Sequence, residues 1–304
     1  MDSVALLIAA AIASGTALAV AALGLLISER SGVLNLGAEG MMLVAAVAGF
    51  ATAVNTHSTL LALLAGALAG AALSAIFGVL VIWLHTNQYA TGLALSLFGS
   101  GLSAFLGISY VSESLGERAL PPIPLLGELP FVGPALFRQH PFVYFTVIAT
   151  IAIAWFLFRT KSGLVLRAIG ESPESAHALG YPVRKLRLLA VCVGGAMTGL
   201  AGAYISVIHT PLWVEGMIAG KGWIALSLTA FATWRPLRVL FGAYLFGGVT
   251  MLQLHLQGHG VEVPVQLLTV LPYVATIVVL VLISRNPGWI RSNMPASLGK
   301  PFTG

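Results

Sequence analysis

Between two long apolar runs, residues 159–188 read Arg159-Thr-Lys-Ser-Gly-Leu-Val-Leu-Arg-Ala-Ile-Gly-Glu-Ser-Pro-Glu-Ser-Ala-His-Ala-Leu-Gly-Tyr-Pro-Val-Arg-Lys-Leu-Arg-Leu188. This polar stretch holds six of the fifteen Lys and Arg residues of the chain. Lys and Arg are retained on the cytoplasmic side of membrane proteins. The stretch therefore predicts how the apolar runs on either side of it are oriented.

A short helix is predicted inside the stretch, over residues 173–179. Ser172 can cap it by accepting a hydrogen bond from a free backbone N–H, and Pro173 fits the first helical position. Glu174 complements the positive end of the helix dipole. Gly180 can adopt the left-handed conformation that ends a helix. About two turns result, and a helix this short is unstable alone in water.

Two interpretations of this helix follow from the residues. It is either a connector held by its flanking membrane helices or a projection presented to a cytoplasmic partner. In the second case Ala176, Ala178 and Leu179 are its apolar contact surface.

The composition is that of an integral membrane protein, because hydrophobic residues make up 58% and charged residues only 8% of the chain. A spanning helix needs about 20 apolar residues. The single cysteine, Cys192, excludes a disulfide, and a net charge of +5 is too small to indicate a nucleic-acid partner. We expect one all-α polytopic domain over residues 1–304 with about nine or ten crossings, some short or broken, at residues 4–27, 41–54, 59–84, 89–108, 142–158, 188–208, 218–234, 239–256 and 264–283.

The basic residues predict the orientation of these crossings. If residues 159–188 are cytoplasmic, alternation places twelve Lys and Arg residues inside and only Arg118, Arg138 and Lys221 outside. The N-terminus is then external and the C-terminus cytoplasmic. Residues 109–139 form a Pro- and Gly-rich external loop.

Two short apolar segments are preceded by Gly-rich polar sequence. Residues 31–40 contain Asn35 and Glu39, and residues 215–223 open the second segment. Polar groups and broken backbone are costly in lipid unless they line a cavity or pack against protein. The alternative is tight helix packing through small residues. Broken segments entered from opposite sides indicate a transporter built from inverted repeats.

Asn87, between two predicted helices, and Ser227, within one, complete the set of candidate pathway residues with Asn35 and Glu39. The sequence contains no zinc-protease, nucleophile-elbow or phosphate-loop motif. We therefore expect no catalytic residues, no metal site and no cofactor of its own, which argues against a membrane enzyme.

Three stretches carry a family resemblance: residues 31–42, residues 167–176, and residues 220–225 followed by 245–247. They resemble permease subunits of bacterial ABC importers, and more closely the branch that handles nucleosides and simple sugars, related to the ribose and branched-chain amino-acid permeases. The resemblance spans nearly the whole chain.

The resemblance implies that the short helix is a coupling helix, which docks in a groove of an ATPase subunit. ATP would be bound by that partner. A second permease subunit, an external substrate-binding lipoprotein and membrane lipid are the other implied partners, in a bacterial cytoplasmic membrane. A stand-alone secondary transporter or channel is the rival interpretation. The implied coupling residues are Glu171, Ser172, Pro173, Glu174, Ala176, Leu179 and Gly180.

Overall fold

The computed structural model describes residues 2–116, 132–258 and 293–304, with residues 270, 274, 277, 278 and 281. This part of the chain is helical and contains no strand, which confirms the all-α prediction. The helices are α1 (Asp2–Arg30), α2 (Ala38–Thr56), α3 (Thr59–Gly78), α4 (Gln88–Gly107), α5 (Pro141–Arg159), α6 (Lys161–Glu171), α7 (Pro173–Ala178), α8 (Val183–Tyr204), α9 (Lys221–Phe231) and α10 (Pro236–Gly258). Single π-helical turns extend α3 (Val79–Trp83) and α8 (Ile205–His209), and short turns stand at Ile108–Tyr110 and Gly133–Phe137.

Seven of the described helices are long and apolar enough to cross a membrane: α1, α2, α3, α4, α5, α8 and α10. The predicted crossing at 218–234 is wrong as a full span, because only the 11 residues of α9 are helical. At 1.5 Å per residue α9 is about 16 Å long, roughly half of the hydrocarbon core. The predicted crossing at 264–283 falls almost entirely outside the described residues.

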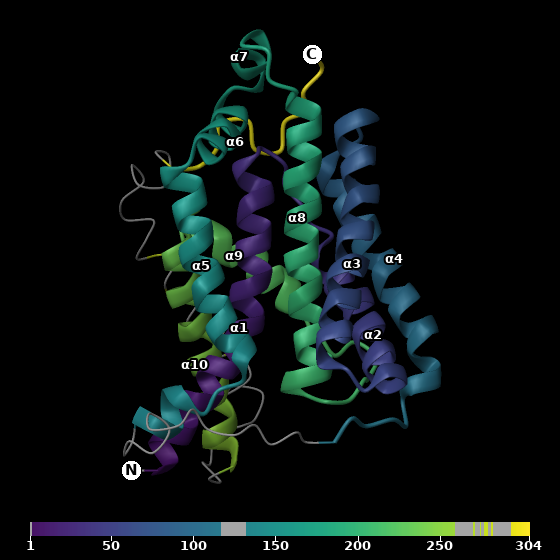
Figure 1. Cartoon of the computed structure of the whole chain (residues 1–304), viewed down its shortest axis with the longest axis vertical. Coiled ribbons are helices and arrows are strands. Elements are labelled where there is room, and N and C mark those ends of the chain that lie inside the picture. Colours follow the sequence, from purple (N-terminus) through teal and green to yellow (C-terminus); the bar gives the residue numbers. More distant parts are fainter. Residues whose placement is uncertain are drawn as a thin grey trace.

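The helices are arranged around α1 and α8, which lie side by side in the middle of the molecule (Figure 1). α5 and α10 lie on one side of this pair, and α2, α3 and α4 lie on the other. α7 and residues 293–304 are at one end of the long axis, which we call the α7 end, and the N-terminus is at the opposite end.

Glycines let the central helices touch backbone to backbone. A Cβ atom on Gly70 of α3 would lie 2.3 Å from the carbonyl oxygen of Gly195 of α8. A Cβ atom on Gly24 of α1 would lie 2.4 Å from the carbonyl oxygen of Gly194. Small residues permit such close approach in membranes, where burial of apolar surface does not drive helices together. α1, α3 and α8 therefore form a tightly packed centre.

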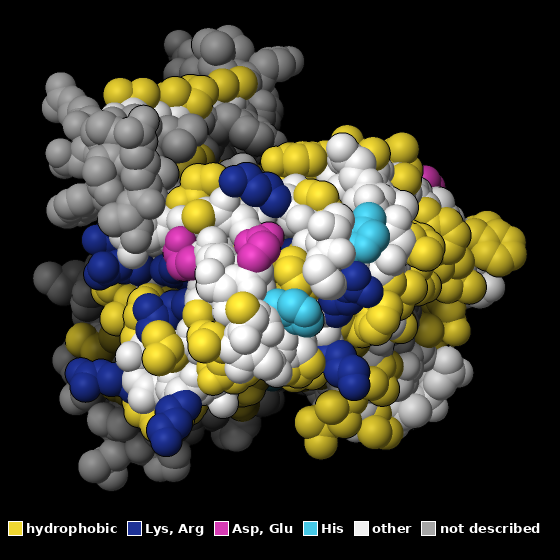
Figure 2. Space-filling model, turned by 90° about the horizontal axis from the view of Figure 1, so that it is seen from above, with side chains coloured by type: hydrophobic (Ala, Val, Ile, Leu, Met, Phe, Trp, Pro, Cys, Tyr) yellow, Lys and Arg dark blue, Asp and Glu magenta, His cyan; other side chains and the backbone are white. Residues whose placement is uncertain are grey.

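The predicted cytoplasmic basic residues within the described part gather at the α7 end (Figure 2). Arg30, Arg184 and Arg187 all donate hydrogen bonds to residues 293–304. Lys221, predicted to be external, does not lie at either end of the molecule's long axis but within it (Figure 1). It lies at the first position of α9, beside Glu39, because the segment before α9 folds back into the molecule.

Candidate functional site

Glu39 joins the two Gly-rich segments that precede α2 and α9. Its Oε1 accepts a hydrogen bond from the Gly220 N–H at 2.8 Å, and its Oε2 accepts one from the Gly222 N–H at 2.7 Å. Gly220 adopts φ +83°, a conformation that favours glycine, and a Cβ atom on Gly222 would lie 2.6 Å from the Glu39 backbone. The carboxylate thus caps α9 from a residue 181 positions earlier.

The same carboxylate is in the first turn of α2, so it stands at the N-terminal ends of two helices. Helix N-termini carry partial positive charge and unpaired N–H groups, which a carboxylate satisfies. Glu39 thus packs against protein, which is one of the two ways expected to make a polar group tolerable in the membrane. Tight packing through small residues is found in residues 31–40, because Gly40 packs its backbone against Ser96 of α4. The cavity-lining interpretation stays a prediction.

The two broken segments enter from opposite ends of the molecule. Gly32 accepts a hydrogen bond from the Gly299 N–H at the α7 end. Leu212, ahead of the second segment, pairs with Ser114 in an isolated bridge near the opposite end. This is the arrangement that inverted repeats require.

The other three predicted pathway residues do not join Glu39 in one cluster. Asn35 is buried, and its Oδ1 accepts a hydrogen bond from the Gly37 N–H in the turn before α2. Asn87 is exposed and caps α4 through the N–H groups of residues 89 and 90. Ser227 is exposed on α9 and bonds the carbonyl of Trp223, in its own helix. Each of these three side chains therefore bonds the backbone of its own helix or of the turn just before a helix.

A second polar centre, which the sequence analysis missed, lies where α1 ends. Glu29 is 1% exposed, and its carboxylate accepts hydrogen bonds from the Thr229 hydroxyl and the Trp234 indole. Arg30 donates two hydrogen bonds to the Trp234 carbonyl. Thr233 and Trp234 both have positive φ, at +50° and +51°, so the α9–α10 turn is strained. The end of α1 holds this turn in place. The sequence signal for this centre is the charged pair Glu29-Arg30, which directly follows a long apolar run.

The short helix α7 forms as its local sequence predicts. The Ser172 side chain accepts a hydrogen bond from the Ser175 N–H, and Pro173 occupies the first position. Gly180 has φ +87°, and the Tyr181 N–H returns to the Ala176 carbonyl, which closes the C-terminal end. The predicted boundaries, 173–179, agree with Pro173–Ala178 to within one residue.

The predicted contact surface of α7 needs one correction. Leu179 is 77% exposed and Ala178 is exposed, as expected. Ala176 is only 4% exposed, because Phe302 and Ile169 cover it inside the same chain. It therefore anchors α7 and is not available to a partner. Glu171 and Glu174 are exposed at the same end.

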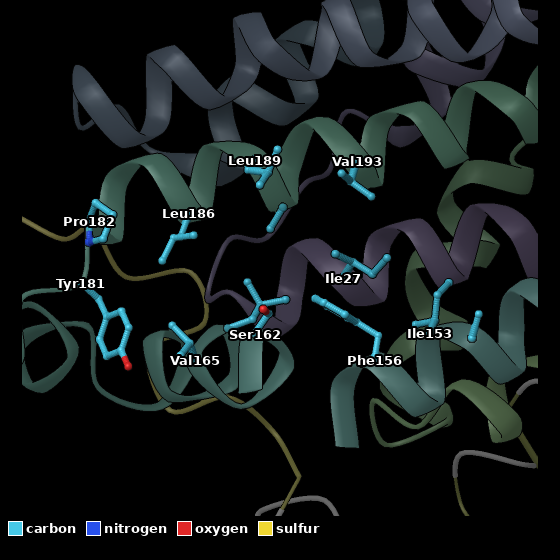
Figure 3. Close-up of a pocket in the computed structure, with 13 residues that line it drawn as sticks. Ile27, Ile153, Phe156, Ser162, Val165, Tyr181, Pro182, Leu186, Leu189 and Val193 are labelled. Carbon is cyan, nitrogen blue, oxygen red and sulfur yellow. The ribbon is translucent and has the colours of Figure 1, made fainter. Parts of the chain in front are cut away.

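An apolar cavity of about 730 Å³ lies below α6, between α5 and α8 (Figure 3). Its lining is almost entirely hydrocarbon, and the hydroxyls of Ser162 and Tyr181 are its side-chain polar groups. A polar solute would leave its own hydroxyls unpaired there, which is unfavourable. The cavity is thus unsuited to polar solutes.

The sequence of the chain matches a known family of membrane permeases. Residues 7–283 match the model of the family described as branched-chain amino acid transport system / permease component. The chain belongs to this family. No solved structure matches it.

Three relatives align with this chain over most of the length of both proteins. TsgC13 of Haloferax volcanii, whose name gives glucose provisionally as the substrate of its ABC transporter, is 41% identical over 96% of this chain and 95% of its own. The guanosine ABC transporter permease protein NupQ of Bacillus subtilis is 32% identical over 92% and 91%. The nucleoside ABC transporter permease protein NupC of Lactococcus lactis is 32% identical over 88% of each. The chain is thus a polytopic membrane permease similar to subunits of ABC transporters.

Proposed function

We propose that this permease is the membrane-spanning subunit of an ATP-driven importer for nucleosides or simple sugars. The observation that carries the coupling to ATP is α7. This helix is capped at both ends, anchored through Ala176 and projects Leu179 at the basic end of the molecule. An exposed leucine on a rigid short helix fits an apolar groove of a partner.

The partners follow from this assignment. A separate ATPase subunit binds ATP and receives α7, so the α7 end faces the cytoplasm. A second permease subunit, an external substrate-binding lipoprotein and membrane lipid complete the assembly. The relatives come from bacteria and from Haloferax volcanii, and we place this chain in a bacterial cytoplasmic membrane.

The solute path runs along the surface where the two broken segments meet. Glu39 fixes the start of α9, and α9 presents Ser227 and Trp223 on its exposed side. Half-crossing helices that end near the middle of the membrane are where transporters of several folds place their solutes. Asn35 and Asn87 support the path by holding the starts of α2 and α4.

The variant Leu179→Asp tests the coupling. Burial of an unpaired charge at an interface costs several kcal/mol, which is roughly a hundredfold or more in affinity. We expect the variant to keep its melting temperature, because Leu179 is exposed, but to lose the co-purified ATPase and ATP-driven uptake. Leu84→Asp is the matched control, since Leu84 is 64% exposed and lies outside α7.

The buried Ala176 gives a contrasting outcome. Ala176→Asp places a charge against Phe302 and Ile169, so it lowers the melting temperature itself. If Leu179→Asp transports at the parent rate with its ATPase bound, α7 is not the coupling helix, and the secondary-transporter interpretation is favoured.

A further inference from the structure

Residues 293–304 form a non-helical segment that connects two parts of the α7 end. The Ser297 N–H donates to the Gly170 carbonyl of α6 at 2.9 Å. The Gly299 N–H donates to the Gly32 carbonyl, in the turn after α1, at 3.1 Å. The segment therefore bonds both to the α6–α7 pair and to the start of the broken segment that leads to Glu39.

This connection includes a buried hydroxyl, that of Ser297, and a buried guanidinium, that of Arg187. Ser297 is 6% exposed, and its hydroxyl donates to the Gly170 carbonyl at 2.7 Å while it accepts from Arg187 Nη2 at 2.9 Å. Arg187, from α8, also donates through Nε to the Ser31 carbonyl at 3.0 Å. A buried guanidinium needs all such partners, so the loss of one disturbs the others.

Phe302 continues the contact to α7 itself. It is 5% exposed and packs with Ile169, Ala176 and Val183 in one hydrophobic cluster. Its ring packs against the His177 ring in a T-shaped arrangement, with centroids 5.6 Å apart. Ala176 of α7 is buried in this same cluster.

One side of α6 faces the apolar cavity. Val165 of α6 and Tyr181, just after α7, face the apolar cavity, across which lie Leu186 and Leu189 of α8 (Figure 3). Beside this cavity, α6 meets α8 in the hydrophobic cluster that contains Ile169 and Val183. Residues 293–304 therefore add to the contacts with α6 and α8 that fix α7 relative to the membrane helices.

We propose that Ser297 and Phe302 are positioning residues of the transport cycle. Phe302 holds α7 in its docking orientation, and Ser297 with Arg187 passes the displacement of α6 and α7 to Ser31, at the start of the segment that carries Glu39. This inference rests on the proposed function for the transport step. The positioning of α7 is independent of it.

Amide hydrogen exchange of the full chain in lipid nanodiscs tests the positioning. In Phe302→Ala we expect the amides of residues 174–181 to exchange roughly tenfold faster or more, since an apolar contact of α7 is lost. Thr303→Ala is the matched control, because Thr303 is the exposed neighbour of Phe302. Phe302→Leu restores apolar bulk and should return exchange toward the parent rate.

A transport assay tests whether Ser297 and Arg187 pass the displacement of α6 and α7 to Ser31. In the complete importer, Ser297→Ala should bind its ATPase at the parent level but hydrolyse more ATP for each solute carried. A purely structural role would reduce the amount of complex and leave that ratio unchanged. Parent exchange rates at residues 174–181 in Phe302→Ala would overturn the positioning of α7. A parent ratio in Ser297→Ala would overturn the transmission, whereas a parent protein without ATP-driven uptake would instead refute the proposed function.

Discussion

The variant Glu39→Gln removes half of the cap on α9 and leaves the shape of the side chain intact. A glutamine has one acceptor oxygen, so its amide NH₂ group would face either the Gly220 or the Gly222 N–H as donor against donor. The loss of one hydrogen bond to a charged acceptor costs about 1.5–3 kcal/mol. That corresponds to a shift of roughly 10- to 150-fold in the population of the capped arrangement.

We expect Glu39→Gln to insert in the membrane at the parent level and to transport solute more slowly. Hydrogen exchange at residues 220 and 222 should rise by the same factor, because both amides donate to Glu39. Glu215→Gln is the matched control, since Glu215 is exposed in the same Gly-rich segment. Parent uptake together with parent exchange in Glu39→Gln would refute the role of this cap.

Two further predictions concern orientation and stability. In a Cys192→Ser background, Ser172→Cys should react with an impermeant thiol reagent only from the cytoplasmic side and Glu113→Cys only from outside; labelling of both from one side would contradict the orientation. Arg30→Ala leaves the buried Trp234 carbonyl, in the α9–α10 turn, without the Arg30 donor. This loss lowers the free energy of unfolding by about 1–3 kcal/mol, so the melting temperature should fall. The exposed neighbour Arg235 is the control, and an equal fall in Arg235→Ala would contradict a specific role for Arg30.

Local sequence signals predicted local structure well. Ser172, Pro173 and Gly180 lie next to the helix ends that they fix, so their effects depend on a few residues. The long apolar runs likewise predicted the spans, because each needs only its own composition. The half-length of α9 was the exception. Its glycines indicated a break, but hydropathy does not reveal how far the break extends.

Contacts between distant segments were not predictable from pattern alone. Sequence indicated that Glu39 needed a partner, and yet the partner is a pair of backbone N–H groups at Gly220 and Gly222, which carry no side-chain signal. Ala176 was misassigned for a related reason. It is buried in a cluster that includes Phe302, and nothing near either residue in the sequence indicates that they meet.

If the solute passes the start of α9, as proposed, the cap there would also act as a charge filter. An open helix N-terminus near the middle of the membrane attracts carboxylates and phosphates. Here the protein's own Glu39 carboxylate already fills that position. Its charge would repel a second negative charge brought within 4 Å by about 4 kcal/mol in a partly buried setting. The neighbouring Lys221 reduces this repulsion. Nucleotides, sugar phosphates and free amino acids, through their carboxylates, are disfavoured on these grounds, whereas nucleosides and free sugars carry no charge for the filter to reject.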